Sequence, residues 1–202
     1  MNRRQFITGL LASGFALAAG GPAVPPEPVH QPLTGVDILP ASGRAPTSMV
    51  VLLHGFGGNS EQLRWVAEAW AQTMPDTVFV LPDAPEQCRD NTDPQSRQWF
   101  AARALDPDAA ARAAQIRVTE PVLNAHITSK LAQYGLTDDR LVIAGFSQGA
   151  IMALHAAPRR RHPCAAVVAY NGMLADPNGL RRDRLVRMPV LVAHGRQDTV
   201  VP

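Results

Sequence analysis

The chain has 202 residues, which suits one domain with a single sizeable core. Hydrophobic residues make up 46 % and charged residues 18 %, a globular composition that excludes a disordered chain. The formal net charge is only +2, from 19 Lys+Arg against 17 Asp+Glu, and removing Arg3 and Arg4 would leave 17 of each sign. Charge balance therefore gives no support to a role in binding nucleic acid or an anionic membrane.

Residues 1–20 have the features of an export signal. Arg3 and Arg4 precede an apolar run from Phe6 to Ala19, and Ala16-Leu17-Ala18 supplies a small-x-small cleavage pattern. Consecutive arginines followed by Phe two positions later resemble a twin-arginine signal. The alternative is an uncleaved membrane anchor, but the run is shorter than the ~20 residues that a span needs. We therefore expect an exported protein, periplasmic or secreted, that loses this segment.

Residues 21–47 form a proline-rich lead-in and the start of the domain, and residues 48–202 form the domain itself. Pro22 to Pro32 is expected to be stiff and extended rather than a binding motif. The chain has two cysteines, Cys88 and Cys164. They could pair in an oxidising compartment or remain two buried thiols, and the sequence leaves both possibilities open.

Short apolar runs alternate with helical stretches along the domain, which predicts an α/β fold with a mostly parallel sheet between helices. We expect helices from near Asn59-Ser60, from Asp106 to Tyr134 with an interruption or restart at Pro121, and from Gly149 to about Ala157. The runs predicted as buried strands are 48–53, 77–81, 141–144, 165–170 and 189–193. Reactive groups in such a fold belong at the carboxyl ends of the strands, where three motifs lie.

The first motif is Gly145-Phe146-Ser147-Gln148-Gly149, directly between an apolar strand and a helix. Gly-x-Ser-x-Gly in this context is the nucleophile elbow of the α/β-hydrolase fold. The serine backbone is strained there, and glycines at both flanks remove side chains that would collide with the neighbouring strand and helix. We therefore predict that Ser147 is a catalytic nucleophile.

The second motif, His54-Gly55-Phe56-Gly57-Gly58, follows the first buried strand. An α/β-hydrolase takes one oxyanion-hole N–H from this loop and the other from the residue after the nucleophile, which predicts the backbone amides of Phe56 and Gln148. A dinucleotide fingerprint would need a third glycine, and a phosphate loop would need Gly-Lys-Ser/Thr; both are absent. For His54 we weigh a catalytic role against a structural hydrogen-bonding role and favour the latter.

The third motif runs from His194 to Pro202 and follows the last apolar strand. A carboxylate on the loop after a late strand is where the acid of a catalytic triad belongs, and the order Ser then Asp fits this fold. Asp198 would hold a histidine in the correct tautomer and stabilise its protonated form. A simple turn residue is the alternative for an Asp in such a loop.

With Arg97-Gln98-Trp99-Phe100 added, these blocks together resemble the phospholipase/carboxylesterase family from about Met49 to Pro202. Acyl-protein thioesterases and small bacterial carboxylesterases belong to it. The resemblance implies a serine hydrolase without metal or cofactor that cleaves acyl esters, thioesters or lysophospholipids through an acyl-serine intermediate. It also implies that Trp99 and Phe100 lie near the acyl pocket, with core packing as the alternative.

The sequence departs from the family pattern in its histidines. In the family the catalytic histidine follows the acid by roughly thirty residues, after one more helix and strand. None of the six histidines lies after Asp198; they are His30, His54, His126, His155, His162 and His194. We therefore expect the C-terminal helix and strand of the fold to be missing, either because the sequence is an incomplete record of a longer gene or because the protein is a catalytically dead binding protein with this fold.

Overall fold

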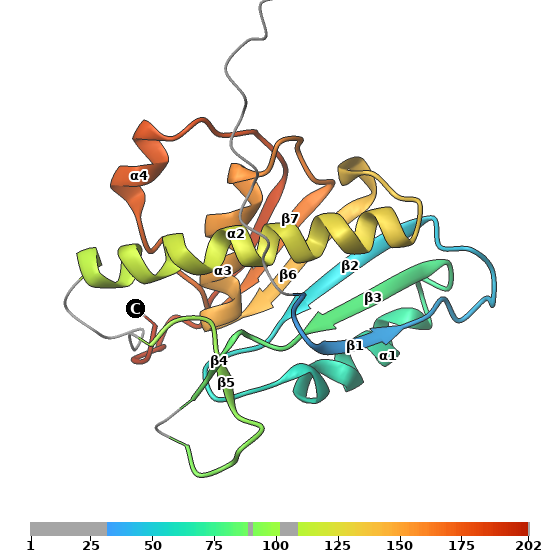
Figure 1. Cartoon of the computed structure of the whole chain (residues 1–202), viewed down its shortest axis with the longest axis horizontal. Coiled ribbons are helices and arrows are strands. Elements are labelled where there is room, and N and C mark those ends of the chain that lie inside the picture. Colours follow the sequence, from blue (N-terminus) through green and yellow to red (C-terminus); the bar gives the residue numbers. More distant parts are fainter. Residues whose placement is uncertain (1–31, 89–90, 102–108, 202) are drawn as a thin grey trace, which may run out of the picture.

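The computed structural model describes residues 32–88, 91–101 and 109–201. The predicted signal peptide and residues 21–31 of the lead-in lie outside the described residues. A six-stranded sheet forms the centre of the molecule, with strand order β1-β3-β2-β6-β7-β8 (Figure 1). Within the described residues, no helix is both long and apolar enough to span a membrane.

Each of the five predicted strands is present, and together they form a parallel sheet, so the predicted α/β architecture with a mostly parallel sheet is confirmed. Val50 pairs with Phe79 on one side and Val142 on the other, which places β2 in the middle of the sheet. These strands are β2 Ser48–Leu53, β3 Thr77–Pro82, β6 Leu141–Phe146, β7 Ala166–Tyr170 and β8 Val190–Ala193. Strands β2 and β3 are almost fully buried, as continuous apolar runs predict.

A sixth strand, β1 (Gly35–Ile38), was not predicted from the sequence. It pairs antiparallel with β3 at the edge of the sheet. Its residues are only half-buried or exposed, so it lacks the continuous apolar signature that identifies the interior strands.

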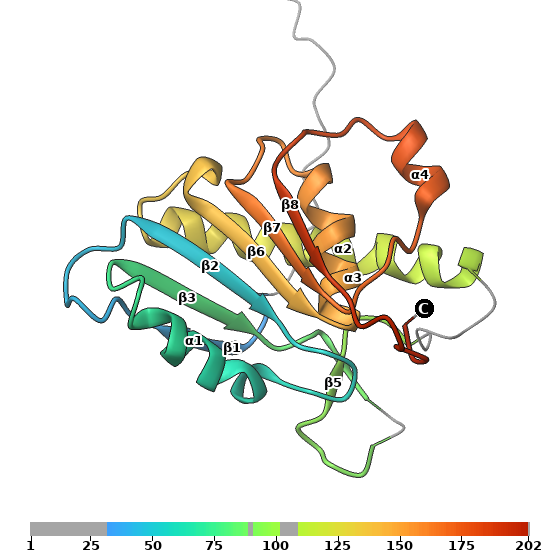
Figure 2. The ribbon, with the colours of Figure 1, turned by 180° about the vertical axis from the view of Figure 1, so that it is seen from behind.

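Helices cover the two faces of the sheet unequally. Helices α2 (Ala109–Gln133) and α3 (Gln148–Ala156) lie over one face (Figure 1). Their buried side chains and that face of the sheet make the main core, which includes Ile116, Leu123 and Ile151. On the other face, α1 (Arg64–Ala71) packs near β3, and none of the described helices covers β7 and β8 (Figure 2).

Strand β8 is correspondingly open to solvent. Val190, Leu191 and Val192 are 49 %, 58 % and 54 % exposed, although their sequence reads as a buried strand. Leu191 lies beside Val168 in the sheet, on the same face as α1. The last strand thus has backbone partners on one side only and, among the described residues, little cover over its side chains.

Helix α2 corrects one prediction, because it is a single continuous helix that contains Pro121. Proline removes one helical hydrogen bond, at a cost of about 3 kcal/mol in a helix interior. Pro121 lies on the exposed side of α2, where water can hydrate the carbonyl that loses its partner. Ile116, Leu123 and Ile127 are fully buried on the opposite side and keep the helical period through the proline. Core packing therefore maintains the helix, which ends at Gln133 and is followed by Gly135 in a left-handed conformation (φ 66°).

The predicted helix start near Asn59-Ser60 is a 3-10 turn, η1 (Ser60–Leu63), that leads into α1. The Asn59 side chain accepts from the Gln62 amide, as expected of an N-cap residue. Five further short elements among the described residues were not predicted as such. They are the hairpin of β4 Glu86–Gln87 and β5 Arg97–Gln98, the 3-10 turns η2 Asp138–Arg140 and η3 Ala157–Arg159, and the helix α4 Pro177–Arg182.

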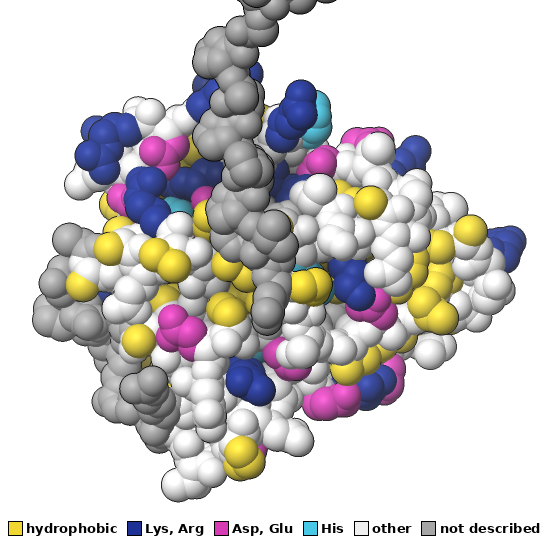
Figure 3. Space-filling view, viewed as in Figure 1, with side chains coloured by type: hydrophobic (Ala, Val, Ile, Leu, Met, Phe, Trp, Pro, Cys, Tyr) yellow, Lys and Arg dark blue, Asp and Glu magenta, His cyan; other side chains and the backbone are white. Residues whose placement is uncertain are grey.

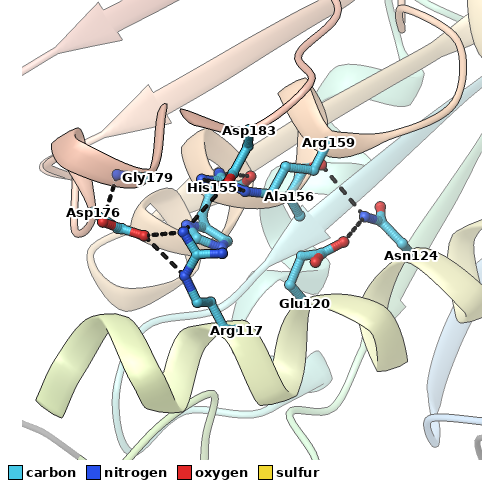
Figure 4. Close-up of polar contacts among 9 residues, drawn as sticks. All are labelled: Arg117, Glu120, Asn124, His155, Ala156, Arg159, Asp176, Gly179 and Asp183. Atoms are coloured by element: carbon cyan, nitrogen blue, oxygen red, sulfur yellow. Dashed lines mark hydrogen bonds and ion pairs between the residues drawn. The ribbon is translucent and has the colours of Figure 1, made fainter. Parts of the chain in front are cut away.

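Helix α4 belongs to the connection between β7 and β8, which ion pairs fasten to α2 and η3 (Figure 4). Arg117 of α2 donates to Asp176, the N-cap residue of α4, and also reaches Asp183 at 3.2 Å. Arg159 donates to Asp183 from the other side at 2.6 Å. Basic and acidic side chains accordingly gather together over this part of the surface (Figure 3). The network holds the connection that leaves the end of β7, where Tyr170 and Asn171 lie beside the candidate site.

Candidate active site

Ser147 sits in a strained turn between β6 and α3. Its backbone has φ 53° and ψ −117°, a positive φ that is uncommon outside glycine and costs about 1–3 kcal/mol. The surrounding contacts hold this conformation. The Ser147 amide donates to the Tyr170 carbonyl at 2.9 Å, and the Ser147 carbonyl accepts from the Ile151 amide at 3.0 Å.

The two glycines of the elbow are required by close backbone approach. A Cβ on Gly145 would lie 2.4 Å from the Gly149 carbonyl group, and a Cβ on Gly149 would lie 2.1 Å from the Leu53 carbonyl oxygen. Neither contact can be relieved by a side-chain rotation, because both involve backbone. The sequence pattern thus reflects a turn in which strand β6, helix α3 and the end of β2 meet.

The loop after β2 lies against this turn. A Cβ built on Gly55 would be 3.5 Å from the Ser147 Cβ, so the predicted oxyanion loop and the predicted nucleophile are neighbours. Gly57 takes a left-handed conformation (φ 75°), and its amide donates to the Arg97 carbonyl. Within the described residues, neither the Phe56 amide nor the Gln148 amide donates to a protein acceptor. Gln148 is also the first residue of α3, where the helix dipole is positive.

His54 is a buried structural residue in this loop. Its Nε2 accepts from the Ala84 amide at 3.0 Å, so its Nδ1 carries the proton and donates to the Gly55 carbonyl at 2.8 Å. Burial lowers the pKa of the imidazole, which stabilises this neutral form. With both ring nitrogens occupied, His54 has the structural hydrogen-bonding role that the sequence favoured.

The Gln148 side chain joins the elbow to the segment after β5. Its Oε1 accepts from the Trp99 amide and its Nε2 donates to the Phe100 carbonyl, both at 2.7 Å. Trp99 and Phe100 are fully buried in the main core, which accords with the core-packing alternative; their contact with an acyl chain stays a prediction. The Trp99 indole donates to the His54 carbonyl at 2.9 Å. From the sequence, only the backbone amide of Gln148 was considered, and the hydrogen bonds of its side chain to Trp99 and Phe100 were missed.

Asp198 lies on the loop after β8, and its carboxylate is held by three donors. Oδ1 accepts from the amides of Val200 and Val201 at 2.8 and 2.9 Å, and Oδ2 accepts from the Asn171 side chain at 2.6 Å. The Asn171 hydrogen bond, followed by the two backbone amides, lowers the pKa of Asp198 to about 2. The carboxylate is therefore ionised at neutral pH, as an acid that orients an imidazolium must be.

Asn171 and Tyr170 connect this carboxylate to the nucleophile. Tyr170 ends β7 and accepts from the Ser147 amide, and Asn171 is the next residue, with φ 52°. The Asn171 amide donates to the Ala193 carbonyl at the end of β8. Ser147 after β6 and Asp198 after β8 thus flank the end of β7, which couples them through one peptide group and one side chain.

The structure joins none of the described histidines to the Ser147 hydroxyl by a hydrogen bond. His126 of α2 and His155 of α3 are buried, each with an Nε2 that has no hydrogen-bond partner among the described residues. His194 Nε2 donates to the Val201 carbonyl and lies 3.6 Å from Asp198 Oδ2. His162 is exposed, and His30 lies outside the described residues.

No group of three or more His, Cys, Asp or Glu side chains suited to a metal ion is found in the part of the chain that the structure describes. Cys88 and Cys164 are both buried and free.

A parallel sheet with a strained serine between two crowded glycines, beside a glycine-rich loop, defines the α/β-hydrolase class. The chain belongs to the phospholipase/carboxylesterase family, whose model matches residues 37–202. It is 31 % identical to acyl-protein thioesterase 1 of Mycosarcoma maydis over 178 residues, which cover 81 % of this chain and 74 % of that protein. Its fold is also similar to the crystal structure of esterase PE8, with a TM-score of 0.79 and 38 % identity over 85 % of this chain and 79 % of the other.

A third relative is esterase YpfH of Escherichia coli K12, 26 % identical over 153 residues. That match covers 76 % of this chain and 62 % of YpfH. The chain thus spans less than two thirds of the length of this relative.

Proposed function

We propose that this protein is a serine hydrolase that cleaves acyl esters or thioesters through an acyl-serine intermediate on Ser147. The observation that carries the proposal is the strained Ser147 turn, which lies against the loop after β2. The Phe56 amide of that loop and the Gln148 amide next to Ser147 have no protein acceptor among the described residues. Membership of the phospholipase/carboxylesterase family and the likeness to esterase PE8 support the same chemistry.

The proposed reaction has two steps. The Ser147 hydroxyl gives its proton to a base while its oxygen attacks the acyl carbonyl, and the carbonyl oxygen becomes negatively charged. The Phe56 and Gln148 amides would donate to that oxygen, with help from the positive end of α3. Collapse of this tetrahedral intermediate breaks the bond to the leaving group, which takes the proton back from the base and departs as the alcohol or thiol, leaving the acyl group on Ser147. Water, deprotonated by the same base, then attacks the acyl-serine, and the Ser147 oxygen regains a proton as the carboxylic acid product leaves.

Asp198 would act as the acid that orients the base. It is ionised, and its Oδ2 is directed by Asn171. The family pattern places the base, a histidine, after this acid, and the matches with the relatives cover 62–79 % of their lengths. In the proposed mechanism, a histidine at that position, after Asp198, is the base.

Ester hydrolysis by the protein expressed from its complete reading frame, beside the 202-residue chain, tests this function. Release of p-nitrophenol from acyl esters of increasing length should depend on Ser147, and Ser147→Ala should lower kcat by about 10⁶. The matched control is Ser42→Ala, an exposed serine far from the elbow in sequence. Equal rates in the Ser147→Ala variant and the wild type would exclude the proposed nucleophile.

A catalytically dead binding protein is the alternative, and one observation favours it: the Ser147 hydroxyl has no histidine partner among the described residues. The same assay separates the two functions. A protein that binds an acyl ester but does not turn it over, with a stop codon directly after codon 202, would establish the alternative. Turnover that depends on Ser147 would exclude it.

We also propose that the protein is exported. The support is the arginine pair before the apolar run Phe6 to Ala19 and its small-x-small site. N-terminal sequencing of the protein from a periplasmic fraction should find a start close to Ala19. An intact Met1 in a membrane fraction would indicate an uncleaved anchor instead.

A further inference from the structure

Asn171 occupies an unusual position at the end of β7. Its backbone is left-handed (φ 52°), a conformation that asparagine tolerates better than most residues other than glycine. This conformation directs the chain so that the Asn171 amide reaches the Ala193 carbonyl while the side chain reaches Asp198. One residue therefore contacts both the end of β8 and the carboxylate on the loop that follows β8.

The bond from Asn171 to Asp198 is the shortest of the three that the carboxylate accepts, at 2.6 Å against 2.8 and 2.9 Å. The other two donors are backbone amides of the same loop and move with it. Asn171, in contrast, follows β7, so its hydrogen bond fixes the position of the Asp198 carboxylate relative to the sheet. Hydrogen bonds to a carboxylate are charge-assisted and stronger than neutral ones.

Asn171 is also tied to the nucleophile. The peptide group between Tyr170 and Asn171 accepts from the Ser147 amide through its oxygen and donates to Ala193 through its nitrogen. A shift of Asn171 would therefore move both the Tyr170 carbonyl that binds the Ser147 amide and the side-chain amide that binds Asp198.

We propose that Asn171 is a positioning residue that holds the Asp198 carboxylate at a set place relative to Ser147. This inference rests on the proposed function for its catalytic meaning, because Asp198 matters to the reaction only if the protein is a serine hydrolase. The hydrogen bond and its effect on the carboxylate do not depend on that function.

The test uses Asn171→Gly, which keeps the left-handed backbone because glycine adopts it freely, and which removes only the side-chain donor. Carboxyl-carbon NMR titration of the 202-residue chain should show the pKa of Asp198 rising by about one unit in this variant. The control is Asn178→Gly, which removes an exposed asparagine from α4 and should leave that pKa at its wild-type value.

A second variant, Asn171→Asp, keeps the size of the side chain but brings a second carboxylate to within hydrogen-bond distance of Asp198. Like charges at this distance make ionisation of the pair less favourable, so the apparent pKa should rise further than in Asn171→Gly. An Asp198 pKa that stays within about 0.3 units of the wild type in both variants would overturn the proposal.

Steady-state kinetics of the same variant test whether the position of Asp198 matters for catalysis. In an enzyme that turns over esters, Asn171→Gly should lower kcat about tenfold with KM unchanged, because the acid acts on the base and not on substrate binding. An unchanged kcat would overturn the positioning role. A wild type that does not turn over would contradict the proposed function, while the NMR titration would still decide whether Asn171 controls Asp198.

Discussion

The amide of Ser147 donates to the carbonyl of Tyr170 at 2.9 Å, so the turn that carries the candidate nucleophile is fastened to the end of the neighbouring strand. Parallel strands make this possible, because β6 and β7 end at the same edge and Phe146 pairs with Tyr170. A serine held in a positive-φ conformation needs such outside support. The site therefore depends on the register of the sheet as well as on the five residues of the motif.

Gly149→Ala should destabilise the protein, because the new Cβ would lie 2.1 Å from the Leu53 carbonyl oxygen and backbone must shift to make room. We expect the free energy of unfolding to fall by about 1–3 kcal/mol. Urea denaturation measures this. Gly195→Ala is the matched control, since its Cβ would have no heavy atom closer than 3.8 Å and the free energy should barely change.

Gln148→Ala should also destabilise, for a different reason. It would leave the Trp99 amide and the Phe100 carbonyl, both in fully buried residues, without their partner. An unsatisfied buried backbone group costs about 1–3 kcal/mol, so the unfolding free energy should fall by at least about 2 kcal/mol. Gln72→Ala, at an exposed position after α1, serves as the control. Equal stabilities of the two variants would show that the Gln148 bridge contributes little.

Stability should fall with acidification between about pH 6.5 and pH 4. Burial lowers the pKa of His126 and of His155 from 6.5 to about 4, so in this window the unfolded chain binds more protons than the folded one. The stabilisation from the neutral imidazoles is complete above pH 6.5 and is lost as the pH falls toward 4. Asp37 and Lys130, the charged groups near His126, have opposing effects on its pKa that are smaller than that of burial.

His126→Gln should remove one of these two groups and reduce the slope of unfolding free energy against pH by up to about 1.4 kcal/mol per pH unit. Urea denaturation at half-unit steps from pH 4 to pH 7 measures the slope. His162→Gln, at an exposed position, should leave the slope unchanged. A His126→Gln slope equal to that of the wild type would contradict a neutral buried His126.

The sequence predicted the elements that have a strong local signal. Interior strands such as β2 read as continuous apolar runs, and the Ser147 turn has glycines where the structure leaves no room for a Cβ. Strand β1 was missed because pairing with β3, and not its own hydrophobicity, makes it a strand. Pro121 was expected to interrupt α2, but burial of the opposite side of the helix outweighs the lost hydrogen bond.

The contacts that complete the candidate site join residues far apart in the chain. Gln148 reaches Trp99 across 49 positions and Asn171 reaches Asp198 across 27. An asparagine after a strand is ordinarily a turn residue, so nothing local distinguishes Asn171. Such roles follow from the order of the strands in the sheet, which sequence periodicity does not specify.

The central claim is that Ser147 is a reactive nucleophile, and labelling with a fluorophosphonate probe tests it most directly. The protein expressed from its complete reading frame should be modified at Ser147 when folded, as read by mass spectrometry of the peptide that contains it. The label should be absent from Ser147→Ala and from the urea-unfolded protein. A folded protein that remains unlabelled at Ser147 would contradict the account.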